Sequence, residues 1–280
     1  MSGLDSYFSF ISSVYDDSTV RWHRVFLRDF ERFSSLCGKG MGFDSLVMWV
    51  DELKRRGLSD GSVRQAISAV MGYFSFAGVD VDKARLKLLK RAVKPIEVRV
   101  DVLSEEEVKR VIMAASPFKY KVLFSLMYVY ARRASEVLEL CWSDVDFDSM
   151  TIRFNILKKR SREHAVFHMD ELTATMLARL KRLGKSRGNR VFDVSYEGVR
   201  RAFKTAVKRA GIKEYGRKIT PHILRKSRIT HLLKMGYPVD VVSKYIARHS
   251  NFNTTVQFYR SVTREEIEDI PMLKWLIEEV

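Results

Sequence analysis

With 280 residues, 46% of them hydrophobic, the chain is long enough for two domains with separate cores, and no apolar run reaches the roughly 18 residues of a membrane span. Fifty basic against 34 acidic residues leave a net charge of +16. This charge favours double-stranded DNA as a partner, although a ribosome-associated or generally basic protein would share it. The N-terminus lacks a secretion signal, and Cys37 and Cys141 lack metal-ligand spacing, so we expect a cytoplasmic protein with reduced cysteines.

Residues 1–92 are expected to form a helical domain. Apolar residues recur there with a period of about 3.6, which predicts a helix over residues 62–76. These apolar residues are Val63, Ile67, Val70, Met71 and Phe74. Upstream, a basic run precedes Gly57, as at the C-terminus of a helix. Residues 93–101 contain Pro95 and are expected to form an extended linker.

Residues 102–280 are expected to form a mostly helical domain with a small three-stranded antiparallel sheet, so the fold class is mainly α (α+β). A helix is predicted after Ser104, which has capping-box spacing to Glu107. Residues 151–156 alternate in the manner of a strand and can pair with residues 164–169. The basic run between the two strands is then the hairpin turn.

Three short stretches of this second domain, which also carries most of the positive charge, combine residue types that handle phosphate. They are Tyr130–Glu136, Pro221–Lys226 and Arg248–Tyr259. Thr220 and Pro221 predict a helix start that places His222 and Arg225 on one face, at the helix end that favours anions. Guanidinium groups bind two phosphate oxygens at once. Histidines can transfer protons and a tyrosine can attack phosphorus.

The order of these candidates resembles the catalytic set of the tyrosine recombinase family (phage integrases and Xer-like recombinases), and the resemblance runs from about residue 5 to the C-terminus. The set is Arg133, Lys159, His222, Arg225, His249 and Tyr259. The family box, small-Leu-Arg-x-Ser-Glu-Leu, corresponds here to Ala131–Val137. The extra Arg132 makes the register ambiguous, and the Ser-Glu pair that follows favours Arg133. Lys158 similarly competes with Lys159.

Other positions depart from the family pattern. Leu-Gly-His-Ser becomes residues 247–250 here, so Arg248 stands where the family has glycine, a change expected to alter the local turn. Lys226 stands where the family often has a second histidine. Tyr245 is expected to be a core residue in an apolar stripe, and Phe258 is expected to pack beneath the nucleophile. The scarcity of asparagine and glutamine, four and two residues, is a pattern of proteins from hot environments and suggests an archaeal or thermophilic member.

The resemblance implies DNA strand transfer that is independent of metal and ATP. Tyr259 would attack phosphorus and leave a covalent 3′-phosphotyrosyl link, while the arginines and His249 stabilise the developing charge. His222 would assist proton transfer and Lys159 would protonate the leaving 5′ oxygen. No cofactor and no metal are expected, and the sequence has neither a phosphate-binding loop nor a His-Glu-x-x-His motif.

The resemblance also implies an architecture and a task. Residues 1–92 would be the core-binding domain that clamps DNA, and residues 102–280 the catalytic domain. A helix from about residue 263 would link protomers into a tetramer on two DNA sites, although the sequence is equally compatible with a helix that covers its own core. Accessory proteins are further possible partners. The candidates for DNA contacts are Lys54, Arg55, Arg56, Arg64, Lys158, Arg160 and Lys226. The expected function is site-specific recombination (integration, excision or dimer resolution). A type IB-like topoisomerase and a non-catalytic DNA-binding relative remain the alternatives.

Overall fold

A computed structural model describes residues 3–93, 101–157, 162–184, 188–248, 254–256 and 258. The chain divides into two compact units, Met1–Glu97 and Val98–Val280, and each has its own hydrophobic core. In the described parts of the chain, no helix is long and apolar enough to cross a membrane.

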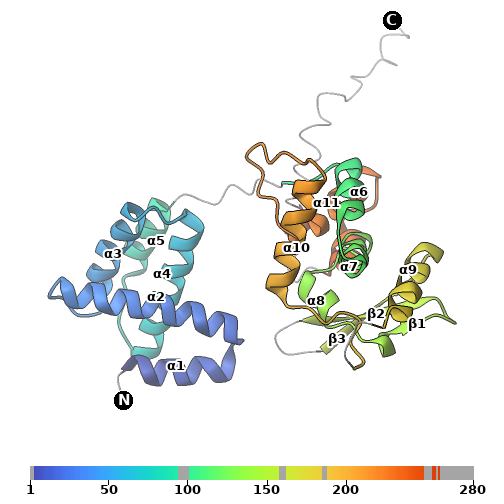
Figure 1. Ribbon diagram of the computed structural model, residues 1–280. Helices are drawn as coiled ribbons and strands as arrows, with labels where there is room; N and C mark the ends of the chain where they lie inside the picture. The colour runs from blue at the N-terminus through green and yellow to red at the C-terminus, as the bar shows by residue number, and fades with distance from the viewer. Residues whose placement is uncertain are drawn as a thin grey trace, which may run out of the picture. The chain divides into compact units, whose positions relative to one another are not determined.

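The N-terminal unit is helical, and it is drawn in blue to cyan in Figure 1. Its helices are α1 (Gly3–Val14), α2 (Asp17–Leu36), α3 (Phe43–Arg55), α4 (Asp60–Ala77) and α5 (Lys83–Ala92). Side chains of Asp16, Ser59 and Asp82 cap α2, α4 and α5 by accepting hydrogen bonds from backbone N–H groups of the first turn. The predicted helix over 62–76 lies within α4, whose apolar stripe is buried and which ends at Gly78 with φ 68°.

The end of α5 is anchored in the N-terminal core. Val93 is fully buried there, and its carbonyl accepts a 2.6 Å hydrogen bond from Nη2 of Arg64. Lys54 donates to the neighbouring carbonyl of Ala92 at 2.8 Å. Residue 93, predicted as the first linker residue, therefore packs with the helical unit, and residues 94–100 of the predicted linker lie outside the described residues.

The second unit is mainly helical with one small sheet, which confirms the predicted fold class. Its helices are α6 (Glu105–Ala114), α7 (Phe118–Val129), α8 (Ala134–Leu138), the 3₁₀ helix η1 (Trp142–Asp144), α9 (Glu171–Arg182), α10 (Tyr196–Arg209), α11 (His222–Lys234), α12 (Val239–Val241) and the π-helix η2 (Val242–Ala247). Its strands are β1 (Val145–Asp146), β2 (Thr151–Leu157) and β3 (Arg162–His168).

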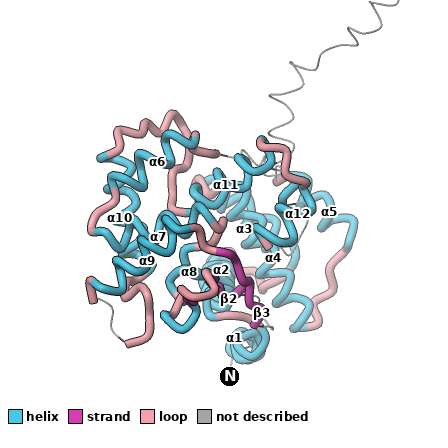
Figure 2. The backbone as a smooth tube through the Cα atoms, turned by 90° about the vertical axis from the view of Figure 1, so that its right-hand side faces the viewer, coloured by secondary structure: helices cyan, strands magenta, loops and turns pink. Residues whose placement is uncertain are grey.

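The sheet has the antiparallel order β1-β2-β3, and Figure 2 shows its longer strands in magenta among the helices. In the β2–β3 pair, Thr151 lies opposite His168 and Leu157 opposite Arg162, so the two strands are joined as predicted. Helix α7 packs against α6, α9, α10 and α11 and supplies the buried Phe124 to the core. These contacts fix the C-terminal end of α7, and the first arginine motif, Tyr130–Glu136, follows directly after it.

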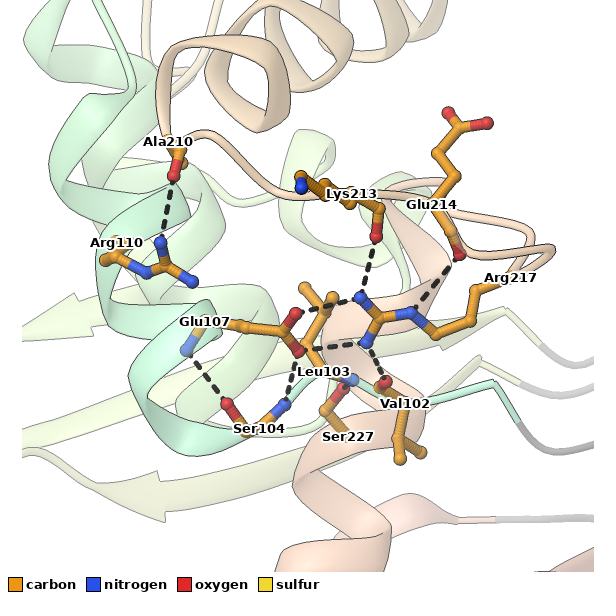
Figure 3. A network of polar contacts seen from close by, with 10 residues as sticks. All are labelled: Val102, Leu103, Ser104, Glu107, Arg110, Ala210, Lys213, Glu214, Arg217 and Ser227. Atoms are coloured by element: carbon orange, nitrogen blue, oxygen red, sulfur yellow. Dashed lines mark hydrogen bonds and ion pairs between the residues drawn. The ribbon is translucent and has the colours of Figure 1, made fainter.

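Helix α6 begins at the predicted capping box. Ser104 Oγ accepts from the backbone N–H of Glu107 at 3.1 Å, and the Glu107 carboxylate accepts from the backbone N–H of Ser104 at 2.9 Å. The same carboxylate binds the guanidinium of Arg217 through both oxygens, at 2.9 and 2.8 Å. Figure 3 shows that Arg217 also donates to the carbonyls of Val102 and Lys213. These hydrogen bonds hold Arg217, in the segment that leads into α11, against the start of α6.

Replacing Arg217 by Met is expected to lower the free energy of unfolding of this unit by about 2 kcal/mol, because a bidentate, largely buried ion pair is broken. The hydrogen bonds from Arg217 lower the pKa of Glu107 from its ordinary value of 4.5. The stabilisation is therefore complete above about pH 4.5 and is lost as the pH falls through the lower folded value. Urea denaturation at neutral pH and at about pH 3 should show the difference between wild type and R217M shrinking in acid; an equal difference at both would contradict this account.

The segment after α12 corrects one prediction. Tyr245, predicted to be a core residue, is 63% exposed. It lies in the π-helix η2, whose hydrogen bonds join residues five apart rather than four. This winding buries Val242 and Ala247, which are five apart, together with Ser243. The prediction was wrong because it assumed a period of about 3.6 residues.

Candidate catalytic site

The turn after α7 sends two successive arginine side chains in different directions. Ala131 is fully buried with φ 50°, a left-handed conformation that reverses the chain at once. The side chain of Arg132 is then completely buried, whereas that of Arg133 is 43% exposed. Arg133 donates from Nη1 to Glu136 Oε1 at 2.7 Å, and its backbone N–H donates to Oε2 at 2.9 Å. Of the two arginines, Arg133 is the one whose side chain a ligand can reach in this turn.

Helix α11 brings the second motif to this turn. It begins at His222, directly after Pro221, and Arg225 lies in its first turn with 1% of its surface exposed. Arg225 donates from Nη1 to the carbonyl of Ala131 at 2.6 Å and from Nη2 to the carbonyl of Ala247 at 2.7 Å. Burial, together with the charge of Arg133, lowers its pKa to about 9, so it remains a cation at neutral pH.

His222 is an exposed residue at the start of α11. Desolvation by the surrounding protein, followed by the positive charges of Arg225 and Lys226, lowers its pKa to about 4. The imidazole is therefore neutral at pH 7 and can accept a proton. Lys226 is partly buried, and its charge is one of those that lower the pKa of His222.

Glu136 is the shared partner of three arginines. Its carboxylate is completely buried, 2.7 Å from Nη1 of Arg133, 3.8 Å from Nη1 of Arg225 and 3.9 Å from Nη1 of Arg132. One negative charge therefore faces three positive charges, and the cluster keeps a net charge of +2 in a poorly solvated place. Such an arrangement favours the binding of a phosphate, whose oxygens accept several charge-assisted hydrogen bonds.

Sequence reasoning did not assign a role to Glu136 or to Arg132. Glu136 was used only to set the register of the arginine box, although a carboxylate three residues after an arginine at a helix start is itself a signal for an ion pair. Among the described residues, no group of three or more His, Cys, Asp or Glu is placed to hold a metal ion.

Arg248 takes the left-handed conformation in which glycine is expected, with φ 51°. Its side chain is half-buried, and in the described part of the chain Nε is buried without a hydrogen-bond partner. The departure from glycine therefore leaves the turn in place and adds backbone strain and an unsatisfied polar atom to it.

Replacing Arg248 by Gly is expected to raise the free energy of unfolding by about 1 kcal/mol, because glycine adopts this conformation without strain. R248A is the matched control, since it removes the same side chain but keeps a Cβ in the left-handed region. We expect thermal unfolding to rank R248G above R248A. Equal stability of these two variants would show that the backbone at residue 248 is not strained.

Several predicted site residues lie outside the described residues: Lys158, Lys159, Arg160, His249 and Tyr259. What the structure describes are their neighbours. Leu157 and Arg162 form the last pair of the β2–β3 hairpin. Phe258 is buried in a small cluster with Ala131 and Val242, close to the turn that carries the arginines.

The predicted DNA contacts of the N-terminal unit are mostly engaged within the protein. Arg56 binds Asp29 and Glu52, while Lys54 and Arg64 donate to backbone carbonyls at the end of α5. Arg55 also pairs with Glu52, but its side chain is 73% exposed. Arg55 is therefore the most accessible of the four predicted residues, because the side chain of Arg56 is 41% exposed and Lys54 and Arg64 are partly buried.

The predicted DNA contacts did not include a basic depression beside α5. It has a volume of about 550 Å³ and is lined by Arg64, Lys83, Leu86, Lys87, Lys90, Arg91 and Val93. The signal was present in the sequence, because α5 reads KARLKLLKRA, with cations at half of its positions. A basic helix of this kind provides several phosphate contacts at once.

The chain is similar in sequence and fold to known DNA recombinases. Residues 101–266 match the phage integrase family. Tyrosine recombinase XerA of Pyrococcus horikoshii is 28% identical over 273 residues, which cover 93% of this chain and 90% of the relative. Tyrosine recombinase XerD of Halalkalibacterium halodurans is 25% identical over 255 residues, which cover 81% of this chain and 79% of the relative.

Solved structures share the fold at lower identity. A lambda integrase dimer bound to a COC′ core site has a TM-score of 0.73 at 16% identity, covering 92% of this chain and 94% of that one. A XerA recombinase crystal structure has a TM-score of 0.52 at 22% identity, covering 96% and 98%.

Proposed function

Because the chain belongs to the phage integrase family, a family of tyrosine site-specific recombinases, we propose that Tyr259 is its nucleophile and forms the covalent 3′-phosphotyrosyl intermediate. As a tyrosine recombinase the protein breaks and rejoins DNA strands. The observation that carries the assignment of the site is the arginine cluster around Glu136, which retains a net positive charge where Arg133 is exposed. A phosphodiester supplies the missing negative charge.

The two family arginines would act differently on that phosphate. Arg133 has an exposed guanidinium, so it can turn its free N–H groups to the non-bridging oxygens. Arg225 is buried and already donates to two carbonyls. Its contribution is therefore a fixed positive charge, with the N–H groups that the two carbonyls leave free held in a set orientation. Preorganised donors of this kind are typically worth about 3 kcal/mol each in the transition state.

Proton transfer would fall to three residues. His222 is neutral at pH 7 because its pKa is about 4. The negative charge of a bound phosphate would raise this pKa and make His222 a stronger base near the attacking tyrosine. Lys159 would protonate the leaving 5′ oxygen, and His249 would donate a hydrogen bond to the phosphate. The product is a 3′-phosphotyrosyl link and a free 5′-hydroxyl, and attack by another strand's 5′-hydroxyl reverses the step.

The N-terminal unit would act as a core-binding clamp, with the basic depression beside α5 and the exposed Arg55 as its phosphate contacts. A lambda integrase that shares the fold of this chain was solved as a dimer on a core site, and we take this as support for self-association on DNA. We extend this to a tetramer on two DNA sites in the cytoplasm, linked by the C-terminal segment from about residue 263.

Covalent trapping tests the nucleophile. The protein is incubated with fragmented genomic DNA from its source and denatured in SDS, and the DNA that stays attached is sequenced. We expect adducts that cluster on one sequence and disappear in Y259F. Y245F is the matched control, because Tyr245 is the exposed tyrosine of η2 and its loss should leave the adducts intact.

Other outcomes point to other functions. Scattered adducts that depend on Tyr259 would identify a topoisomerase. Duplex binding that weakens with salt but gives no adduct would identify a non-catalytic DNA-binding relative. Adducts that survive in Y259F and disappear in Y245F would move the nucleophile to Tyr245.

A further inference from the structure

We propose that Arg132 is a positioning residue for strand cleavage: together with Arg225 it holds the end of η2 against the turn at Tyr130–Ala131. This inference rests on the proposed function, since it concerns the same site. It assigns a role to an arginine that cannot itself reach the DNA, because its side chain is completely buried.

The hydrogen bonds of Arg132 join two segments far apart in the sequence. Nε donates to the carbonyl of Tyr130 at 2.7 Å, and Nη2 donates to the carbonyl of Ile246. The guanidinium also lies 5.0 Å from the centre of the Phe167 ring on β3. One side chain therefore connects the end of α7, the end of η2 and the hairpin.

Arg225 makes the same connection one residue further along each segment. It donates to the carbonyls of Ala131 and Ala247, next to the two carbonyls held by Arg132. These four carbonyls lie at the C-terminal ends of α7 and η2, where a helix leaves its last carbonyls without partners. Cations are favoured at such ends by the helix dipole, so the two guanidiniums form a double clamp, defined here as Arg132 and Arg225 with their four carbonyls.

The cost of burying Arg132 indicates that its charge serves a purpose. Burial is large enough to lower the pKa of Arg132 to about 10. The nearest compensating negative charge is the carboxylate of Glu136, 3.9 Å from Nη1 of Arg132. In the described part of the chain, its Nη1 has no hydrogen-bond partner. An apolar side chain of similar volume would avoid these costs, but it could not bind the carbonyls of residues 130 and 246.

The double clamp lies next to two of the proposed catalytic residues, Arg133 and His249. On the first segment, Ala131 has φ 50° and Arg133 follows two residues later; on the second, Arg248 has φ 51° and directly precedes His249. Two left-handed residues in one small region are strained. Fixing the four carbonyls at or just before these residues sets the direction in which each segment continues.

The test compares R132M, R132K and R217M. R132M keeps much of the side-chain volume without donors, R132K keeps the charge with one donor group, and R217M breaks another multidentate arginine network of the same unit. Single-turnover cleavage is measured on a nicked duplex built from the trapped sequence, over a range of DNA concentrations and well below each unfolding temperature. Hydrogen exchange of residues 242–248 is measured on the free proteins.

For R132M we expect a cleavage rate at saturating DNA lower by about 10- to 100-fold, as for a small misplacement of reacting groups. The half-saturating DNA concentration should stay unchanged, exchange in residues 242–248 should rise, and R132K should recover part of the rate. R217M should leave both readouts near wild type. Unchanged exchange in R132M, or a loss of rate that R217M shares, would overturn the inference.

The two proposals can fail separately. If the wild type forms no adduct, the proposed function fails, while the exchange of residues 242–248 still tests the clamp. If the wild type cleaves and R132M cleaves equally well, the function stands and the positioning role of Arg132 is wrong.

Discussion

Replacing Glu136 by Gln is expected to destabilise the catalytic unit by about 3–5 kcal/mol, which is the cost of leaving buried charges without their partner. The carboxylate is completely buried and is the shared anion of Arg132, Arg133 and Arg225. A glutamine amide has a similar shape, but it removes the negative charge and turns two N–H donors toward guanidinium donors. The three cations would then repel one another around a buried, uncharged amide.

Chemical denaturation of wild type and E136Q measures this loss directly. E197Q is the matched control, because Glu197 forms an exposed pair with Arg200, its side chain being 61% accessible, and surface pairs contribute about 0–1 kcal/mol. We expect the loss in E136Q to exceed that in E197Q by several fold. Equal, small losses in the two variants would mean that solvent or bound anions already compensate the arginine cluster.

The same cluster explains which parts of the site could be predicted. Arg133, His222 and Arg225 could be proposed as site residues because local rules apply to them: a register set by Ser135-Glu136, and a helix start at Pro221. The capping box of α6 and the β2–β3 hairpin followed from equally local patterns. Each rule depends on residues within about one helical turn or along one strand.

What could not be predicted depends on contacts across the fold. No local pattern shows that Arg132 is buried, because its partners are the carbonyl of Ile246 and the ring of Phe167, more than 30 residues away. The exposure of Tyr245 was missed because the segment is a π-helix, in which different residues share a face than in the expected α-helix. The engagement of Arg56 with Asp29 likewise joins two helices. The sequence therefore shows where the positive charges lie along the chain, but not which groups they contact in the fold.

Replacing Arg133 by Met is expected to lower the rate of covalent cleavage by about 10²–10³-fold, the usual effect of removing one preorganised donor to the transition state. Stability should change little, by about 1 kcal/mol or less, because the side chain is 43% exposed and its ion pair with Glu136 is partly screened by water. Glu136 also keeps Arg132 and Arg225 as partners.

The contrast with R132M separates the two neighbouring arginines. R133M should lose cleavage while residues 242–248 exchange hydrogen as in wild type, because Arg133 contacts Glu136 rather than η2. Its loss should also raise the pKa of Arg225, which the charge of Arg133 lowers. If instead R133M cleaves normally and R132M is inactive with unchanged exchange, the register is shifted by one residue and the phosphate is bound by Arg132. Since Arg132 is completely buried in the free protein, that result would require the turn at Ala131 to open when DNA binds.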